Sequence, residues 1–398
     1  MAIRFWRTLT LAIPFALAAS AQPGDCNAPV ATSPLTLTLP SQPFASRTTK
    51  DGCWIFVSLT GPNSGSQPGI AVVKRRGGKL ELARVIPVKA HPAGMALTHD
   101  GKLLIIAAQD AVLFVDVERA TGGKANPVVG SFSDGPNAES IYANVTADDK
   151  FLFVSEERAR SITVIDLPKV RRNGYKPDAI IGKIPVGNAP IALTFSPDGK
   201  TLYTTSQGAL LDWGWPKACK PEGQPAQDAQ ITRPEGAVIV IDVAQASTDP
   251  AHAVTARVPA GCSPVRMAIS PSGDRIYVTA RNSNAVLAFD TSKLLSDADH
   301  ARLGMATVGS APVPIAVVDG GRKVVAGNSN RFDSQSTAQS LMVLDASKIG
   351  STGDPTIGTI PAGVFPRELS VSADGRTLFL TNFGSNTLQV MNVDSIGR

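Results

Sequence analysis

The feature that most constrains this chain is an internal repeat of short strands. The first tight turn of successive copies recurs at intervals of 49, 48 and 50 residues, at Asp51, Asp100, Asp148 and Asp198. The last complete copy, Phe365 to Val393, contains three runs of alternating apolar and polar residues with tight-turn residues between them. This pattern is typical of antiparallel β-strands. One such unit cannot bury both of its faces, so the copies are expected to stack against one another.

Seven copies of the repeat can be recognised. In the clearest three, a proline opens the first strand and a turn residue follows eight positions later; these prolines are Pro190, Pro264 and Pro366. Weaker copies open at Pro92, Ser140 and Pro312, and the turn Lys50-Asp51-Gly52 marks the earliest and most degenerate copy. A unit of four short strands with a period of roughly 40 to 50 residues is typical of a propeller blade. The sequence therefore predicts an all-β fold, a seven-bladed β-propeller of four-stranded antiparallel blades.

The second strand of the repeat carries a more specific pattern. Its core resembles the repeat of the YVTN β-propeller family at Tyr277–Ala280, Phe379–Asn382, Tyr203–Ser206 and Phe153–Glu156. The Ser-Pro-Asp-Gly turn before this strand and the hydrophobic-Asp pair after it fit the same family. The resemblance covers nearly all of the mature chain and implies an exported seven-bladed propeller of the lactonase-like superfamily. Because this family includes both cell-surface proteins and lactonase-like enzymes, the resemblance leaves the function open.

The N-terminal part of the chain offers the strand that the last copy lacks. Leu35 to Leu39 alternates apolar and polar residues and is ended by Pro40, whereas the last copy stops after its third strand at Val393. We expect this N-terminal strand to complete the seventh blade, because closure of the ring leaves no blade edge unpaired. The propeller domain is then residues 35–398, preceded by a leader of residues 22–34.

Met1 to Ala21 has the features of a signal peptide. Arg4 and Arg7 form a basic start, an apolar run follows, and Ala19-Ser20-Ala21 is a small-residue cleavage site. The run is shorter than the roughly 20 residues that span a bilayer, which disfavours an uncleaved anchor. The sequence predicts an exported protein, located in the periplasm, at the cell surface or outside the cell, with no transmembrane segment after signal removal.

The charge of the chain gives no sign of nucleic-acid binding. The formal net charge is +5, and it falls to +3 when the signal peptide is removed with its two arginines. The only dense basic cluster, Lys169 to Arg172, lies in a connection after a third strand, where a solvated loop is expected. Nucleic-acid binding would require a basic stripe with interleaved aromatic residues. Nucleic acid is therefore not a predicted partner.

Four cysteines in an exported chain indicate two disulfides. In a propeller blade whose strands a to d run outward from the axis, the loops before a and between b and c share one face, and the a–b and c–d loops share the other. This topology pairs Cys26 with Cys53 and Cys219 with Cys262; the alternative is four reduced thiols. A zinc site is not expected, because the chain has neither a C-x-x-C pair nor a histidine close to these cysteines. No metal or other cofactor is predicted.

Two b–c connections are longer than the others, and both are predicted to rise on one face. Residues 208–235 interrupt the fourth blade and residues 328–339 the sixth. The first insertion carries Trp213 and Trp215 on a loop fixed by Cys219, which would suit a preorganised apolar contact surface. The alternative is that both rings pack against the blade and cover it.

A second candidate site lies where the first strands approach the axis. The second residue after each strand opening varies, and these residues are Gly94, Tyr142, Ala192, Arg266, Pro314 and Glu368. Arg266 and Glu368 come from blades two apart, so they either face a ligand on the axis or form solvated ion pairs at the rim. The rim interpretation is favoured, because exposed ion pairs are common and weak. The candidate binding residues are therefore Trp213, Trp215, Arg266, Glu368 and Tyr142.

Catalytic motifs are largely absent, and no catalytic residue is assigned. The chain contains no G-x-S-x-G or H-E-x-x-H motif and no phosphate-binding glycine loop. An aspartate recurs at the end of the third strand, at Asp116, Asp166, Asp242, Asp290 and Asp345, and a structural turn role is expected for it. The favoured hypothesis is a non-catalytic binding or scaffold protein whose insertion-bearing face takes a protein, a glycan, an envelope component or a small molecule. The alternative is a lactonase-like hydrolase or another periplasmic propeller enzyme that uses Arg266 and Glu368, with Glu156 or Asn382, at the channel mouth.

Overall fold

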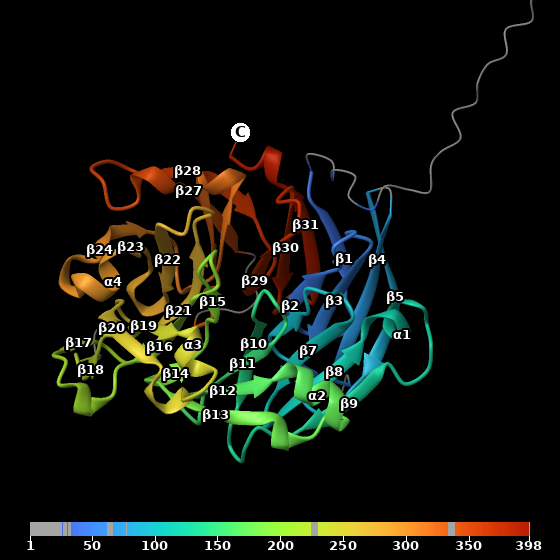
Figure 1. Ribbon diagram of the computed structural model, residues 1–398. Coiled ribbons are helices and arrows are strands. Elements are labelled where there is room, and N and C mark those ends of the chain that lie inside the picture. Colours follow the sequence, from blue (N-terminus) through green and yellow to red (C-terminus); the bar gives the residue numbers. More distant parts are fainter. Residues whose placement is uncertain are drawn as a thin grey trace, which may run out of the picture.

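The computed structural model describes residues 26, 30, 33–61, 67–76, 78–223, 230–332 and 339–397. The predicted signal peptide, most of the leader and the middle of both insertions lie outside these residues. The described chain forms seven antiparallel blades around a central axis (Figure 1), so the predicted propeller is confirmed. Within the described residues, none of the helices has the length and apolar character that a membrane span requires.

In blades 1 to 6, strands a to d follow one another in sequence. Blade 1 consists of β2 (Pro43–Thr48), β3 (Trp54–Leu59), β4 (Gly69–Arg76) and β5 (Lys79–Pro87). Blade 2 consists of β6 (Met95–Leu97), β7 (Leu103–Ala108), β8 (Ala111–Asp116) and β9 (Val128–Phe132). Blade 3 consists of β10 (Ser140–Val145), β11 (Phe151–Glu156), β12 (Ser161–Asp166) and β13 (Ile180–Pro185).

In blade 4, strand a is split into β14 (Asn188–Pro190) and β15 (Thr194–Phe195). Strands b, c and d of this blade are β16 (Thr201–Gly208), β19 (Ala237–Asp242) and β20 (Val254–Pro259). Its b–c insertion holds a small hairpin of β17 (Lys217–Cys219) and β18 (Arg233–Pro234). Blade 5 consists of β21 (Pro264–Ile269), β22 (Arg275–Ala280), β23 (Ala285–Asp290) and β24 (Arg302–Thr307). Blade 6 consists of β25 (Pro312–Val318), β26 (Lys323–Asn328), β27 (Ser340–Asp345) and β28 (Thr356–Pro361).

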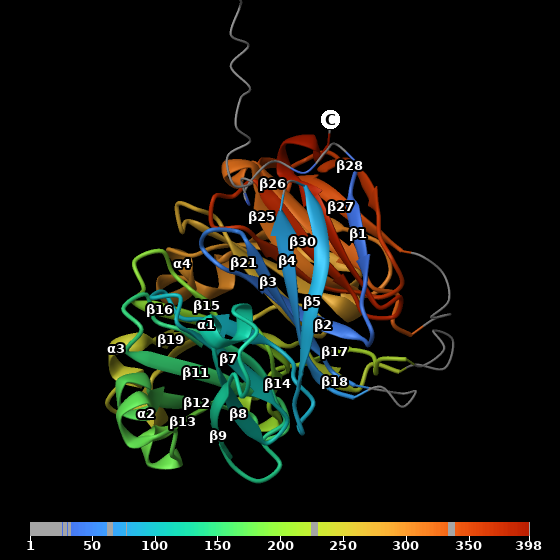
Figure 2. The same ribbon diagram turned by 90° about the vertical axis from the view of Figure 1, so that its right-hand side faces the viewer.

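The seventh blade is closed by the N-terminal strand. It contains β29 (Pro366–Val371), β30 (Thr377–Asn382) and β31 (Thr387–Asn392), and β1 (Leu35–Thr38) forms its outer strand. β1 pairs antiparallel with β31, with Leu35 opposite Val390 and Thr38 opposite Thr387. Figures 1 and 2 show the blue N-terminal strand at the outer edge of the red C-terminal blade. The predicted closure is confirmed.

Hydroxyl groups on strand b connect neighbouring blades at the axis. The side chain of Thr205, Thr279 or Thr381 donates a hydrogen bond of 2.9–3.0 Å to a main-chain carbonyl in strand a of the next blade. Ser58 and Ser155 make equivalent bonds of 2.6 and 3.0 Å to the carbonyls of Ala93, just before β6, and of Ile191, between β14 and β15. These five residues occupy equivalent positions in the repeat, so the threonine of the YVTN-like pattern holds adjacent inner strands together. The inner strands, in turn, form the wall of the axial cavity.

The aspartates at the ends of strand c cap the turn that follows them. Asp116, Asp166 and Asp242 each accept a hydrogen bond from a main-chain N–H in the first turn of a short helix, α1 (Val117–Thr121), α2 (Leu167–Asn173) or α3 (Val243–Ala246). A side-chain oxygen in this position satisfies a helix N–H that has no partner within the helix. The predicted structural role is confirmed for these aspartates. The basic cluster that begins at Lys169 lies in α2, so the predicted loop is helical there.

Both predicted disulfides are present. Cys26 is bonded to Cys53 with their Cα atoms 4.7 Å apart, and Cys219 is bonded to Cys262 with their Cα atoms 5.6 Å apart. Cys53 follows an a–b turn, whereas the second disulfide joins the blade 4 insertion to the loop before β21. We call the face that bears the b–c insertions the insertion face, and the second disulfide fixes the longer insertion to it.

Candidate functional site

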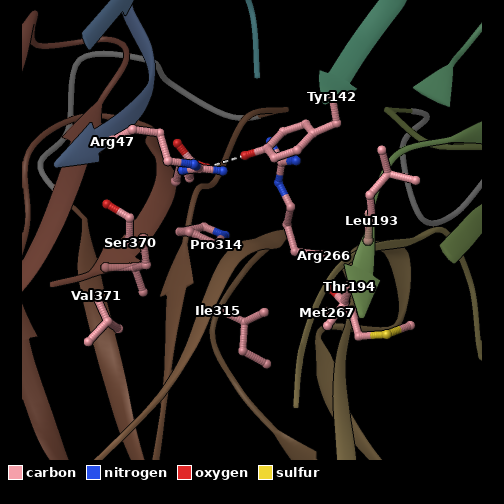
Figure 3. Close-up of a pocket in the computed structure, with 13 residues that line it drawn as sticks. Arg47, Tyr142, Leu193, Thr194, Arg266, Met267, Pro314, Ile315, Ser370 and Val371 are labelled. Carbon is pink, nitrogen blue, oxygen red and sulfur yellow. Dashed lines mark hydrogen bonds and ion pairs between the residues drawn. The ribbon is translucent and has the colours of Figure 1, made fainter. Parts of the chain in front are cut away.

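A cavity of about 310 Å³ lies on the axis of the propeller, among the inner strands. Six of the seven blades contribute to it, and its lining includes six polar side chains, those of Arg47, Tyr142, Thr194, Arg266, Glu368 and Ser370. Leu193, Met267, Ile315, Leu369 and Val371 supply apolar wall. Figure 3 shows the Arg266 side chain beside the Tyr142 ring, with Arg47 on the other side of the cavity. The inner strands therefore bring together charges that are far apart in the sequence.

Glu368 is held by three donors. Its carboxylate accepts hydrogen bonds from Arg47 Nη1 at 2.9 Å, from the main-chain N–H of Ser46 at 2.8 Å and from the Tyr142 hydroxyl. Burial raises the pKa of Tyr142 well above its ordinary value, and the Glu368 charge raises it further, so the phenol stays protonated and donates. Burial alone would lower the pKa of Arg47, but the charge of Glu368 raises it. The carboxylate is thus fully engaged within the protein.

Arg266 has no such partner. Its side chain is buried, with 6 % of the residue exposed, and none of its three guanidinium nitrogens makes a hydrogen bond to any residue that the structure describes. The guanidinium carbon lies 3.9 Å from the ring centre of Tyr142 and 5.7 Å from that of Phe44. Stacking on aromatic rings uses the faces of the guanidinium group and leaves its N–H donors unused. Arg266 therefore presents a charge and a set of hydrogen-bond donors to the cavity.

Three of the site residues predicted from the sequence lie together in the structure, but they are buried rather than exposed at the rim. Tyr142, Arg266 and Glu368 line one cavity. The favoured interpretation of solvated ion pairs at the rim is wrong, because Arg266 and Glu368 expose only 6 % and 5 % of their surface. Glu368 pairs with Arg47 instead, and aromatic rings cover Arg266. The residues are buried because strands from all sides converge at the axis, which a single repeat does not reveal.

The two tryptophans lie elsewhere, at the outer side of blade 4. Both are half-buried; their ring centres are 5.4 Å apart, and the guanidinium carbon of Arg257 in β20 lies 4.9 Å from the Trp213 ring centre. Trp215 lines a separate cavity of about 430 Å³ with Arg257 and Arg302. The tryptophans therefore do not share a cavity with Arg266. A binding role for them stays a prediction.

Glu156 and Asn382, the residues considered for a hydrolase, do not line the axial cavity. Glu156 is fully buried and accepts hydrogen bonds from Ser161, Thr163 and Lys183, the last at 2.6 and 2.7 Å. Asn382 donates to Thr387 at 3.1 Å. Their contacts fix the ends of strands b and c within a blade, which is a structural role.

Two residues of the site escaped the sequence analysis, namely Arg47 and the neighbouring Phe44. Both belong to strand a of blade 1, the most degenerate copy of the repeat. A signal was present, because Pro43 precedes the turn residue Asp51 by eight positions, as in the clear copies. This register places Arg47 where the other blades have small residues, such as Ala268. A stricter alignment of the repeats would therefore have found it.

No metal centre is formed by the described part of the chain, where no three His, Cys, Asp or Glu side chains come close enough to hold an ion. The polar groups of the axial cavity are mainly donors, and its one carboxylate is bound by Arg47. Such a donor set suits an anion rather than a cation.

Comparison with known proteins supports the fold. Residues 236–397 match the family model described as "Lactonase, 7-bladed beta-propeller". The predicted lactonase-like resemblance is confirmed. The matched residues run from the start of β19 to the end of the seventh blade, and they include Arg266 and Glu368 but neither Arg47 nor Tyr142.

Among the solved structures that are similar to this chain, one matches most of its length. It is titled "Kuenenia stuttgartiensis Hydrazine Synthase", has 19 % sequence identity and a TM-score of 0.63, and the likeness covers 90 % of this chain and 97 % of that one. At this identity the likeness shows the fold alone. No curated protein matches the chain.

Proposed function

We propose that this protein is an exported binding propeller that holds a small organic anion in its axial cavity, with Arg266 as the principal donor. The observation that carries the proposal is the buried Arg266 guanidinium, whose nitrogens have no hydrogen-bond partner among the described residues. A buried cation without a partner destabilises the folded protein by roughly several kcal/mol. The presence of the Arg266 guanidinium in this cavity is therefore explained best by a bound anion. Export is supported by the two disulfides.

The walls of the cavity favour an organic ligand over an inorganic one. Side chains of Leu193, Met267 and Ile315 line the space beyond the Arg266 guanidinium. The volume of about 310 Å³ is at the lower end of the range for small-molecule sites. A carboxylate with a compact apolar body would place its charge on Arg266 and its body against these residues. The ligand class is therefore a small organic carboxylate.

Hydrolysis of a lactone is the second candidate function, and the family match over residues 236–397 favours it. Ring opening requires a base that activates water close to the carbonyl carbon. Among the residues that the structure describes, Glu368 is the only carboxylate that lines the axial cavity, and Arg47, Ser46 and Tyr142 already bind it. Glu368 would have to leave these donors to act as a base, so binding fits the geometry better. A screen of γ- and δ-lactones for hydrolysis that is lost in Glu368→Gln would favour the enzyme instead.

Calorimetric titration tests the binding proposal with 4-fluorobenzoate, with its neutral analogue 4-fluorobenzyl alcohol and with inorganic phosphate. We expect 4-fluorobenzoate to bind most tightly of the three compounds. Arg266→Met should weaken the binding of 4-fluorobenzoate by about 10- to 100-fold, which corresponds to the loss of a charge-assisted hydrogen bond. Arg119→Met removes the same charge from the exposed side of α1 and serves as the control. Arg266→Met should melt at or above the temperature of the parent protein, because it replaces a buried unpaired charge by an apolar group. Equal binding to the parent protein and Arg266→Met, or equal binding of acid and alcohol, would refute the proposal.

A further inference from the structure

The lining of the axial cavity becomes more exposed toward one end of the axis. In β2 and β21 the first four residues are buried and the last two are half-buried. In β29, Glu368 and Leu369 are buried, whereas Ser370 and Val371 are half-buried. Each of these strands runs from the insertion face to an a–b turn. The cavity is therefore buried at its Arg266 end and approaches solvent on the face that bears the a–b turns, which we call the a–b face.

Packed aromatic side chains cover the buried end on the side of the insertion face. The centre of the Phe44 ring lies 5.7 Å from the guanidinium carbon of Arg266 and 4.2 Å from that of Arg367. The guanidinium carbon of Arg367 also lies 5.6 Å from the ring centre of Phe365, which directly precedes β29. Both phenylalanines are buried. A ligand that came from the insertion face would have to displace these side chains to reach Arg266.

A second cavity, of about 340 Å³, continues the axial cavity toward the a–b face, and we call it the mouth cavity. The two cavities share Arg47, Ser370 and Val371. The rest of the mouth cavity is formed by the ends of strand a and the a–b turns of blades 1, 2 and 7, namely by Thr48, Lys50, Leu97, Thr98, His99 and Ala373. Three of these residues, Lys50, His99 and Ala373, are exposed, so the mouth cavity is open to solvent.

Arg47 is fixed as part of the wall that the two cavities share. Its Nη1 donates to Glu368 at 2.9 Å and to the main-chain carbonyl of Ser46 at 2.6 Å, which holds the side chain against blades 1 and 7. Figure 3 shows Arg47 and Val371 on one side of the axial cavity and Thr194 on the other. The shared lining and the gradient of exposure together indicate a blind pocket whose open end is at the a–b face.

The path from Arg266 to the a–b face is longer than a benzoate. Glu368 lies at the level of Arg266, because each is the second residue after the proline that opens its strand. Ala373 follows Glu368 by five residues, so it lies roughly 16 Å farther along the axis at about 3.3 Å per residue. Leu97, Val371 and Ala373 offer apolar surface over the last part of this path. A ligand that fills both cavities therefore has a linear apolar extension opposite its acid group.

We propose that the ligand enters from the a–b face with its acid group first and carries a linear apolar extension that occupies the mouth cavity. This inference rests on the proposed function, since Arg266 has to bind the acid group. The ligand class is then narrower than a small organic carboxylate, because it is an acid that is extended along its long axis. Leu97 and Ala373 line the mouth cavity but not the axial cavity, so they select for the extension without contacting the acid group.

Calorimetric titration of the protein with alkylbenzoates tests the direction in which the ligand lies. We expect 4-propylbenzoate and 4-pentylbenzoate to bind successively more tightly than 4-methylbenzoate, by about 2- to 4-fold for each added methylene that enters the mouth cavity. The isomer 3-pentylbenzoate carries the same chain, but it directs the chain sideways against the wall of the axial cavity. It should bind no more tightly than 4-methylbenzoate.

Ala373→Trp fills part of the mouth cavity from an exposed position in the a–b turn of blade 7. We expect it to weaken the binding of 4-pentylbenzoate by about 5-fold or more, because it excludes the last methylenes from the mouth cavity. The binding of 4-fluorobenzoate should stay the same, which also shows that the variant is folded. Ala147→Trp is the matched control, because Ala147 is the exposed residue at the same place in the turn of blade 3 and lines neither cavity.

The outcomes separate the two proposals. If neither 4-fluorobenzoate nor the alkylbenzoates bind the parent protein, the proposed function fails and this inference fails with it. If 4-fluorobenzoate binds and Arg266→Met weakens it, but the 4-pentyl chain adds no affinity or the 3-pentyl chain adds as much, only this inference is overturned. Equal binding of 4-pentylbenzoate to Ala373→Trp and Ala147→Trp would also overturn it.

Discussion

Thr205→Val tests how the hydroxyl groups on strand b hold the inner strands together. Thr205 Oγ1 donates to the carbonyl of Val265 in blade 5 at 2.9 Å and accepts from the main-chain N–H of Ala192 in its own blade at 3.2 Å. Valine has nearly the same shape but leaves both buried main-chain groups without a partner. Each such group costs about 1–3 kcal/mol, so we expect the two together to lower the free energy of unfolding by about 2–6 kcal/mol. Because unfolding entropy scales with chain length, this loss corresponds to a decrease in Tm of about 3 to 8 °C.

Thr204→Val is the matched control for this substitution. Thr204 is the adjacent residue of β16 and is equally buried, but its hydroxyl donates only to the carbonyl of Thr205, at 3.4 Å. Its replacement should change Tm by about 1 °C or less. Differential scanning calorimetry of both variants measures the contrast. Equal decreases in Tm would refute the reasoning, because the bond to the next blade would then contribute nothing beyond a buried threonine.

Three further predictions concern stability. Deletion of residues 22–40 removes β1 and should lower Tm sharply, because it exposes the edge of β31; an unchanged melting curve would contradict closure by this strand. Replacement of Trp213 and Trp215 together by alanine should lower Tm by several °C, since both rings are half-buried against each other; an unchanged Tm would mean that the rings are free to bind a partner. Burial raises the pKa of Asp134 to about 6, so the free energy of unfolding of the parent protein should fall as pH rises from about 4 to 6. Asp134→Asn should not show this fall, and parallel profiles of stability against pH for the two proteins would contradict the prediction.

The architecture of this protein was predictable because each copy of the repeat carries local signals of its own. Turn residues such as Asp198 and Asp374 lie eight positions after the opening proline, and they set the strand boundaries. Closure by β1 followed from counting strands, since the last copy lacks one. The disulfide between Cys26 and Cys53 followed from the face on which each loop lies. All of these inferences depend on the order and direction of the strands, which a strict repeat shows directly in the sequence.

The surroundings of the site were less predictable, because they depend on contacts between distant blades. The variable second position of strand a identified Tyr142, Arg266 and Glu368, but gave no measure of their burial. The partner of Glu368 is Arg47, 321 residues away in the most degenerate copy. Arg331 of the blade 6 insertion lies near Phe365, which directly precedes β29, and no local pattern in the sequence shows this contact.

A crystal of the protein soaked with 4-bromobenzoate provides the most direct test of the axial site. Anomalous scattering locates the bromine without reference to the refined coordinates. We expect a bromine peak in the axial cavity, with the carboxylate within hydrogen-bond distance of the Arg266 guanidinium, and no such peak in crystals of Arg266→Met. Bromine only in the outer cavity beside Trp215, or an axial peak that persists in Arg266→Met, would contradict the assignment of Arg266 as the anion-binding residue.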